Sequence, residues 1–158
     1  MSDNISGTPL VIFMMIEKGT KDDFGRLKAI WESAVKATHD FLDNEDFCYY
    51  KSRITDYFEQ VDLYVYKDGK GEIIGFMGLA GSMIEMLFVD ATCRGCGVGR
   101  ELIAYALGNL SAGRVDVNEQ NAQAVGFYTH LGFRITGRSP VDGEGKPYPL
   151  LHLQCSAD

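Results

Sequence analysis

The chain has 158 residues, of which 46% are hydrophobic and 23% charged, and this is long enough to bury the core of one domain. Its formal net charge is −7, and its lysines and arginines form no cluster. Binding to nucleic acid or to an anionic membrane is therefore not expected, because both depend on concentrated positive charge.

The four cysteines give no metal-binding pattern. Cys93 and Cys96 form a single C-x-x-C pair, and Cys48 and Cys155 lie far from it in the sequence. A zinc ribbon needs a second ligand pair at suitable spacing, so we expect no metal. A reduced, cytoplasmic protein is the default for such a chain.

The N-terminal segment shows no targeting signal. Residues 1–9 are polar and are expected to form a flexible N-terminus, followed by a single domain over residues 10–158. The apolar run at residues 10–16 is too short to span a bilayer and lacks the basic flank of a signal peptide. We predict a first strand from Leu10 to Glu17.

Helical patterns dominate the next forty residues. Thr20 offers an N-cap with Asp23 at the third helical position, and apolar residues at helical spacing predict a helix that ends near Thr38. The sequence from Thr38 to Leu42 breaks this pattern, and a second helix is predicted from Asn44 to Glu59. Two strands bounded by turn residues follow, at Leu63–Lys67 and Glu72–Ala80.

The centre of the chain combines a strand, a glycine-rich turn and a helix. The apolar run Ile84–Val89 predicts a buried strand, and a segment of helical period begins at Val98. The first amides of a helix have no internal acceptor and carry the positive end of the helix dipole, and glycines let an anion approach them closely. We expect a pyrophosphate cradle formed by the turn Arg94-Gly95-Cys96-Gly97-Val98-Gly99-Arg100.

Other interpretations of this turn remain open. Glycines after a strand also serve simply as a tight connection to a helix. The dinucleotide-binding pattern G-x-G-x-x-G fails, because Arg100 stands three residues after Gly97. The Walker pattern fails as well, since no Gly-Lys-Ser or Gly-Lys-Thr is present.

The last third of the chain predicts alternating strands and one helix. A short strand is expected at Arg114–Asn118, and Asn121 has the chemistry of an N-cap for a helix that Gly132 closes. The final strands are predicted at Phe133–Gly137 and Leu150–Gln154. With no internal repeat or linker, the chain is predicted to be one mixed α/β domain.

Two of these segments resemble the GNAT superfamily of N-acetyltransferases. Arg94 to Gly99 is similar to its Arg/Gln-x-x-Gly-x-Gly/Ala motif, and Asn118 to Tyr128, followed by Leu131-Gly132-Phe133, resembles its second block. The stretches Ala37–Leu42, Val117–Asn121 and Gly145–Leu151 resemble the bacterial YjaB-type subgroup. The resemblance implies a splayed, mostly antiparallel mixed sheet of six to seven strands, flanked by about four helices.

The resemblance also implies a donor and a partner. Acetyl-CoA would be the donor, with its pyrophosphate on the amides from Arg94 to Arg100 and its pantetheine arm paired like a strand with Phe88 and Val89. Asn118 and Asn121 are expected to hold the donor or to cap the helix. The acceptor would be a primary amine, such as a protein lysine, a peptide N-terminus or a small amine.

Four groups are candidates for the chemistry of acetyl transfer. An acceptor amine must lose a proton, and Glu85 is our first hypothesis for the base, although a glutamate on a solvated strand face would look the same. His39 with Asp40 is the rival base, or a pair that contacts substrate. Tyr128 corresponds to the tyrosine of the family's second block and would protonate or hydrogen-bond the leaving thiolate.

Further expectations complete this hypothesis. A backbone amide near Phe88 would stabilise the oxyanion, and Tyr148 is a candidate for the acceptor side or for simple packing. The chain is expected to be a monomer or a homodimer. The principal hypothesis is an N-acetyltransferase that acts by direct attack in a ternary complex, and the alternative is an acyl-CoA binding or sensing domain without turnover.

Overall fold

The computed structural model describes residues 15–155. The expected flexible segment at residues 1–9, and most of the strand predicted from Leu10, lie outside this range. The described part of the first strand, β1, is Ile16–Lys18. Among residues 15–155, no helix is both long and apolar enough to cross a bilayer.

One mixed sheet organises the molecule. Its seven strands have the order β1-β2-β3-β4-β5-β7-β6, and every neighbouring pair is antiparallel except β4 and β5. After β1 the strands are β2 (Asp62–Lys67), β3 (Ile73–Ala80), β4 (Met83–Val89), β5 (Arg114–Asn118), β6 (Arg134–Ser139) and β7 (Leu150–Gln154). The expectation of a mostly antiparallel mixed sheet is confirmed.

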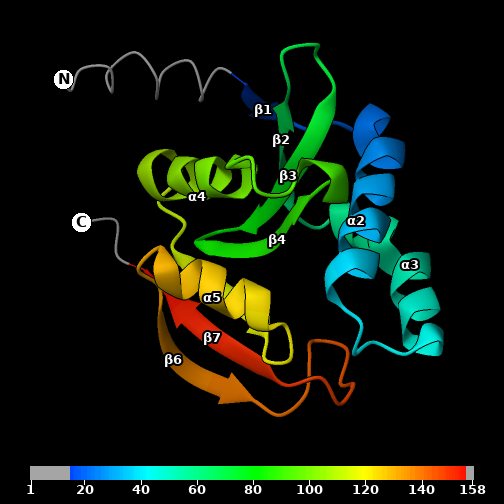
Figure 1. Cartoon of the computed structure of the whole chain (residues 1–158), viewed down its shortest axis with the longest axis vertical. Coiled ribbons are helices and arrows are strands. Elements are labelled where there is room, and N and C mark those ends of the chain that lie inside the picture. The colour runs from blue at the N-terminus through cyan, green and yellow to red at the C-terminus, as the bar shows by residue number, and fades with distance from the viewer. Residues whose placement is uncertain (1–14, 156–158) are drawn as a thin grey trace.

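Four α-helices cover the two faces of the sheet (Figure 1). Figure 1 shows α2 and α3 side by side on the right, and α4 and α5 on the left beside the sheet. A single 3₁₀ turn, η1 (Lys21–Asp23), precedes α2 and is held by the predicted Thr20–Asp23 capping box. The helices are α2 (Phe24–Thr38), α3 (Asn44–Phe58), α4 (Val98–Asn109) and α5 (Ala122–His130).

Two separate cores follow from this arrangement. One core joins α2 and α3 to the sheet around Phe58 and Phe76, both of which are fully buried. The other joins α4 and α5 to the opposite face around Leu102 and Ile103. Because the helices bury apolar stripes on both faces, β3 is almost entirely buried.

A β-bulge interrupts β4 at Glu85. Gly78 pairs with Met86 but Leu79 pairs with Ile84, so Glu85 has no partner residue on β3. The bulge changes which face the side chains occupy: Ile84 packs with the α4 core, whereas Met86 packs with the α2–α3 core. The extra residue therefore directs Glu85 toward the α2–α3 side of the sheet.

The sheet divides between β4 and β5. These parallel strands pair only at Met83 with Arg114 and at Ile84 with Val115. β4 continues to Val89 along β3, while β5 continues to Asn118 along β7. From Glu85 onward the two strands diverge, and we call this point the fork. The splay implied by the family resemblance is thus present in the structure.

Candidate active site

A turn rich in unbonded amides lies between β4 and α4. The short 3₁₀ helix η2 (Ala91–Cys93) follows β4, and Gly95 and Gly97 then adopt φ values of 82° and 85°, which L side chains rarely accept. Within residues 15–155, no backbone N–H from Gly95 to Arg100 donates a hydrogen bond, and the first helical bond joins Glu101 N–H to Gly97 O at 3.0 Å. These amides are available to an anion, as the sequence predicted.

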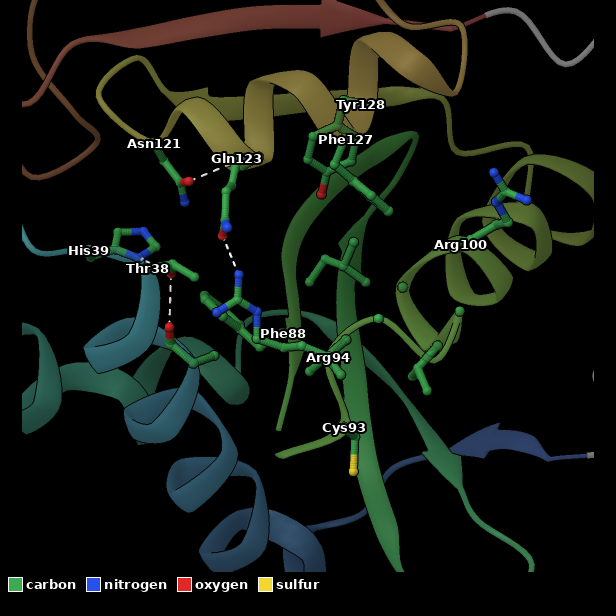
Figure 2. A pocket seen from close by; sticks show the side chains of 18 residues that line it. Thr38, His39, Phe88, Cys93, Arg94, Arg100, Asn121, Gln123, Phe127 and Tyr128 are labelled. Carbon is green, nitrogen blue, oxygen red and sulfur yellow. Dashed lines mark hydrogen bonds between the residues drawn. The ribbon is translucent and has the colours of Figure 1, made fainter. Parts of the chain in front are cut away.

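The turn opens into a cavity of about 480 Å³, called here the donor cavity (Figure 2). It lies between the end of β4, the start of α4, the N-terminal half of α5 and the end of α2. Its wall contains most of the residues expected to hold a donor: Phe88, Val89, Arg94, Gly95, Gly97, Val98, Gly99, Arg100, Asn121 and Tyr128. Among the predicted donor residues, the exposed Cys96 side chain and Asn118 are not part of this wall.

Polar groups are few in the donor cavity. Figure 2 shows Arg94 and Gln123 pointing toward one another from the turn and from α5, and the Arg94 guanidinium donates to Gln123 Oε1. Asn121 caps α5 by accepting from Ala124 N–H at 3.1 Å, as its position predicted, and it is 8% exposed. Its side-chain amide also borders the cavity, so it can cap the helix and face a ligand at once.

The hydroxyl of Tyr128 points into the donor cavity (Figure 2). The ring is 6% exposed and packs edge-on against Phe127 and Phe133, with centroids 5.0 and 5.2 Å away. No group within residues 15–155 hydrogen-bonds the hydroxyl, although the ring itself packs in the core. Burial raises the pKa of Tyr128 above its ordinary value, so the group stays protonated and can donate.

The backbone of β4 offers further groups at the fork. Asp90 N–H bonds to Ile74 O on β3 at 2.9 Å. Because alternate residues of an antiparallel ladder turn their N–H and C=O groups toward the same neighbour, Phe88 also faces β3, whereas Leu87 and Val89 face the fork. The amide expected near Phe88 is therefore that of Leu87 or Val89, and the Phe88 amide itself is turned away.

A second cavity of about 600 Å³, the acceptor cavity, lies on the α2–α3 side of the fork. Phe88 and His39 border both cavities, so the two spaces meet there. Four carboxylate residues border the acceptor cavity and no lysine or arginine does: Glu85, Asp116, Asp142 and Glu144.

Glu85 occupies the fork itself. It lies one residue beyond the last β4–β5 pair, beside Asp116 on β5. The carboxylate reaches solvent, yet the surrounding protein and then the Asp116 charge raise the pKa of Glu85, and Arg114 opposes this shift. A carboxylate that attracts protons more strongly than usual and faces a cavity suits a base.

His39 is also placed for chemistry, but Asp40 is not. Burial lowers the pKa of His39, and the nearby charge of Asp40 only partly offsets this. Thr38 gives its hydroxyl hydrogen to Ala34 O at 2.8 Å, so it accepts from His39 Nδ1 at 2.8 Å, which leaves Nε2 with a free lone pair. Asp40 is exposed, borders neither cavity and makes no hydrogen bond to His39, so it acts on the imidazole only through its charge.

Asn118 and Tyr148 both border the acceptor cavity. Asn118 was expected to hold the donor or to cap the helix, and its Oδ1 accepts from Gln120 N–H at 3.0 Å. It lies apart from the donor cavity because the fork carries the end of β5 away from β4. Tyr148 is 7% exposed, borders the acceptor cavity and donates to Asp46, so it both packs and lines the predicted side.

Sequence reasoning missed several residues of the acceptor cavity. The loop between β6 and β7 is held against α3, where Tyr49 and Tyr57 donate to Glu144 at 2.7 and 2.6 Å and Tyr50 donates to Asp142. Asp116 accepts from His152 across β5 and β7. The only signal for these contacts in the sequence was the acidic, glycine-rich composition of the loop, which does not specify a partner.

Comparisons with known proteins agree with this geometry. The model of the acetyltransferase (GNAT) domain matches residues 28–147. The peptidyl-lysine N-acetyltransferases YjaB of Escherichia coli and Salmonella typhimurium are 44% and 43% identical over 138 residues, which cover 87% of this chain and 94% and 95% of those proteins.

Solved structures show the same fold. The solution structure of apo-form YjaB from Escherichia coli has a TM-score of 0.82 and 43% identity, over 88% of this chain and 95% of that one. The yncA structure from Salmonella typhimurium, which contains acetyl-CoA, has a TM-score of 0.60 at 19% identity, over 90% and 93% of the two chains, and this likeness concerns the fold alone. With matches over most of its length, the chain belongs to the GNAT family of acetyltransferases.

Proposed function

We propose that this protein transfers the acetyl group of acetyl-CoA to the side-chain amine of a lysine in a protein or peptide, by direct attack while both substrates are bound. The observation that carries the proposal is the meeting of the donor and acceptor cavities at Phe88 and His39. The relatives named peptidyl-lysine N-acetyltransferase favour lysine over other amines.

The donor cavity fits the parts of acetyl-CoA. Six consecutive free amides, from Gly95 to Arg100, suit its pyrophosphate, and Arg94 adds positive charge at the edge. The outward N–H and C=O groups of Leu87 and Val89 suit the amides of the pantetheine arm, which would pair with β4 where β5 diverges. When bound, acetyl-CoA supplies the activated acetyl thioester.

The acceptor amine must be neutral before it attacks. A lysine amine with a pKa of about 10.4 is neutral in about one molecule in 2,500 at pH 7, which corresponds to about 4.6 kcal/mol. We assign Glu85 as the base because it borders the acceptor cavity at the fork and its pKa is raised. His39 is the second candidate, since it borders both cavities and its Nε2 has a free lone pair.

Two donors would stabilise the charges that develop during transfer. The N–H of Leu87 or Val89 would bond the thioester oxygen as it becomes negative. The Tyr128 hydroxyl, which is protonated and has no bonding partner in the described protein, would donate to the leaving sulfur. Because burial raises its pKa, donation of a hydrogen bond is favoured over full proton transfer.

Location and assembly are part of the proposal. Cys48, Cys93, Cys96 and Cys155 form no disulfide within residues 15–155, which supports a reducing compartment such as the cytoplasm. A monomer or a homodimer would each leave the two cavities of one chain complete, since all their lining residues come from that chain.

The proposal is tested with purified full-length protein. Calorimetry with acetyl-CoA, ATP and NAD measures donor choice, and we expect heat with acetyl-CoA only. Release of free thiol is then followed with a lysine peptide, an α-amine peptide and spermidine, and we expect the fastest release with the lysine peptide. Binding of acetyl-CoA without amine-dependent release of thiol would instead identify a sensing domain.

A further inference from the structure

Two carboxylates stand next to one another at the fork without a cation between them. Ile84 and Val115 are paired and both pack with the α4 core, so the next residues, Glu85 and Asp116, lie together on the acceptor side. The two carboxylates are close enough to interact, because the negative charge of Asp116 raises the pKa of Glu85. Within residues 15–155, no lysine or arginine forms an ion pair with either one.

Asp116 is fixed in place by a chain of hydrogen bonds that the acetyl-transfer steps above do not use. Its Oδ1 lies 2.7 Å from His152 Nδ1 on β7, and His152 Nε2 lies 2.7 Å from Ser139 Oγ on β6. With Nδ1–H donating to Asp116, Nε2 accepts from the Ser139 hydroxyl, so one neutral tautomer satisfies both contacts. Asp116 Oδ2 makes no hydrogen bond within the described protein.

A pair of negative groups beside a cavity is unfavourable until a cation joins them. Two carboxylates in one site resist simultaneous ionisation, and a primary ammonium relieves this because it offers three donors. His152 holds one oxygen of Asp116, which leaves the other oxygen and Glu85 to share such a group. Because the strands lie in the order β6, β7, β5 and β4, Ser139 and His152 hold Asp116 from one side, and the fork lies on its other side.

We propose that Asp116, positioned by His152 and Ser139, forms with Glu85 a two-carboxylate seat that orients the acceptor ammonium and receives its proton. This inference rests on the proposed acetyl transfer and extends it to residues on β5, β7 and β6. Asp116 contacts the acceptor, and His152 is a positioning residue.

The proton balance is consistent with this seat. An ammonium acceptor loses two protons on becoming an amide, and the leaving thiolate takes up one, so one proton is released to solvent in each cycle. Glu85 receives the first proton from the ammonium, which leaves the neutral amine free to attack. Asp116 and Glu85 both border a cavity open to solvent, so the released proton has a route out.

Other charged and titratable groups lie near Glu85 or border the acceptor cavity. Arg114, two residues before Asp116 on β5, lowers the pKa of Glu85, but by less than Asp116 raises it. The remaining groups belong to the α2–α3 connection, to α3 and to the β6–β7 loop: His39, Tyr50, Tyr57, Asp142, Glu144 and Tyr148. Because the Asp116→Asn change leaves all of these in place, it isolates the contribution of Asp116.

The experiment measures steady-state acetylation of a lysine peptide against pH, with acetyl-CoA affinity measured by calorimetry for each variant. Asp116→Asn is expected to raise KM for the peptide about tenfold, since a hydrogen bond to a charged group is lost. It should also move the acidic limb of kcat/KM to lower pH, because Glu85 loses the negative neighbour that raises its pKa. Acetyl-CoA affinity should not change.

Variants of His152 test the positioning role. His152→Leu should raise KM as Asp116→Asn does, whereas His152→Asn keeps a donor near the Nδ1 position and should restore most of the loss. Asp62→Asn, an exposed aspartate on β2, is the matched control and should behave as wild type.

Three outcomes separate the two proposals. Asp116→Asn with unchanged KM and an unmoved acidic limb, in a protein that acetylates peptide normally, would overturn the seat but not the acetyl transfer. Equal losses in His152→Leu and His152→Asn would remove the positioning role. Wild-type protein that binds acetyl-CoA and acetylates no amine would overturn the proposed function.

Discussion

The two cavities that meet at the fork are built in different ways. The donor cavity is formed largely by backbone amides and apolar side chains of two continuous segments, the turn before α4 and the start of α5. The acceptor cavity is formed by side chains from α2, α3, β4, β5 and the β6–β7 loop, and its charged lining groups are carboxylates. A ligand shared by a whole family can be bound by backbone groups, whereas selection among amines requires side chains that differ between members.

The largest effect is expected from changing the base on the acceptor side. Glu85→Gln should lower kcat/KM by about 100-fold or more, because general-base catalysis contributes about 10² to 10⁴. Because the pKa of Glu85 is raised, its carboxylate takes up a proton at a higher pH than an ordinary glutamate does, and wild-type activity should fall as pH decreases through that pKa. The pH–rate profile checks this, and Glu85→Gln should lack the acidic limb.

The control for this change is Glu72→Gln, an exposed glutamate just before β3. It should retain wild-type activity and the wild-type pH profile. If Glu85→Gln keeps the acidic limb and His39→Gln removes it, the base is His39, which borders both cavities, and not Glu85.

The second effect concerns the backbone of the donor cavity. Gly97→Val places a branched side chain at φ 85°, in the middle of the free amides, where the left-handed conformation costs an L residue about 1–2 kcal/mol. We expect acetyl-CoA affinity to decrease about tenfold or more by calorimetry. Gly108→Ala, at an open position of α4, is the matched control and should bind normally. Equal acetyl-CoA affinity in Gly97→Val and Gly108→Ala would contradict the binding of pyrophosphate by this turn.

A smaller effect is expected at Tyr128. Tyr128→Phe removes the hydroxyl that points into the donor cavity but keeps the ring between Phe127 and Phe133. Loss of one hydrogen bond to the leaving sulfur should lower kcat about tenfold. Acetyl-CoA affinity should stay within about twofold, since one neutral contact contributes little to it. Unchanged turnover would exclude Tyr128 from the chemical step.

The smallest effect is expected at the edge of the acceptor cavity. Glu144→Gln weakens the contacts that Tyr49 and Tyr57 make with the β6–β7 loop, and both tyrosine bonds lower the pKa of Glu144 in the native protein. We expect KM for a lysine peptide to rise about threefold while acetyl-CoA affinity stays constant, because the contacts are exposed and the new carboxamide oxygen can still accept one of the hydrogen bonds. A change in acetyl-CoA affinity would show that the cavities are not independent.

Local patterns in the sequence predicted most of the fold. The second helix was expected at Asn44–Glu59 and is Asn44–Phe58, and the strand at Arg114–Asn118 has the predicted ends. Tight turns and helix caps are encoded within a few residues, as Thr20 with Asp23 and Asn121 with Ala124 illustrate. The free amides of the donor cavity are equally local and were predictable for that reason.

The remaining features depend on contacts between distant residues. The bulge at Glu85 is a register shift against β3. With strict alternation along β4, the side chains of Glu85 and Met86 would lie on opposite faces of the sheet. Asp116 meets His152 only because β7 inserts between β5 and β6. Asp40 adjoins His39 in the chain but does not bond to it, so neighbourhood in sequence was misleading there.

The fork has a consequence for the mechanics of the protein. In the described part of the chain, only two residue pairs join the β1–β4 half of the sheet to the β5–β7–β6 half. A ligand lying along the outer edge of β4 would supply the missing rungs and tie the halves together. Amide hydrogens of Leu87 and Val89 should then exchange with deuterium more slowly while a ligand lies between β4 and β5. The sheet of this enzyme would be continuous only in the substrate-bound state.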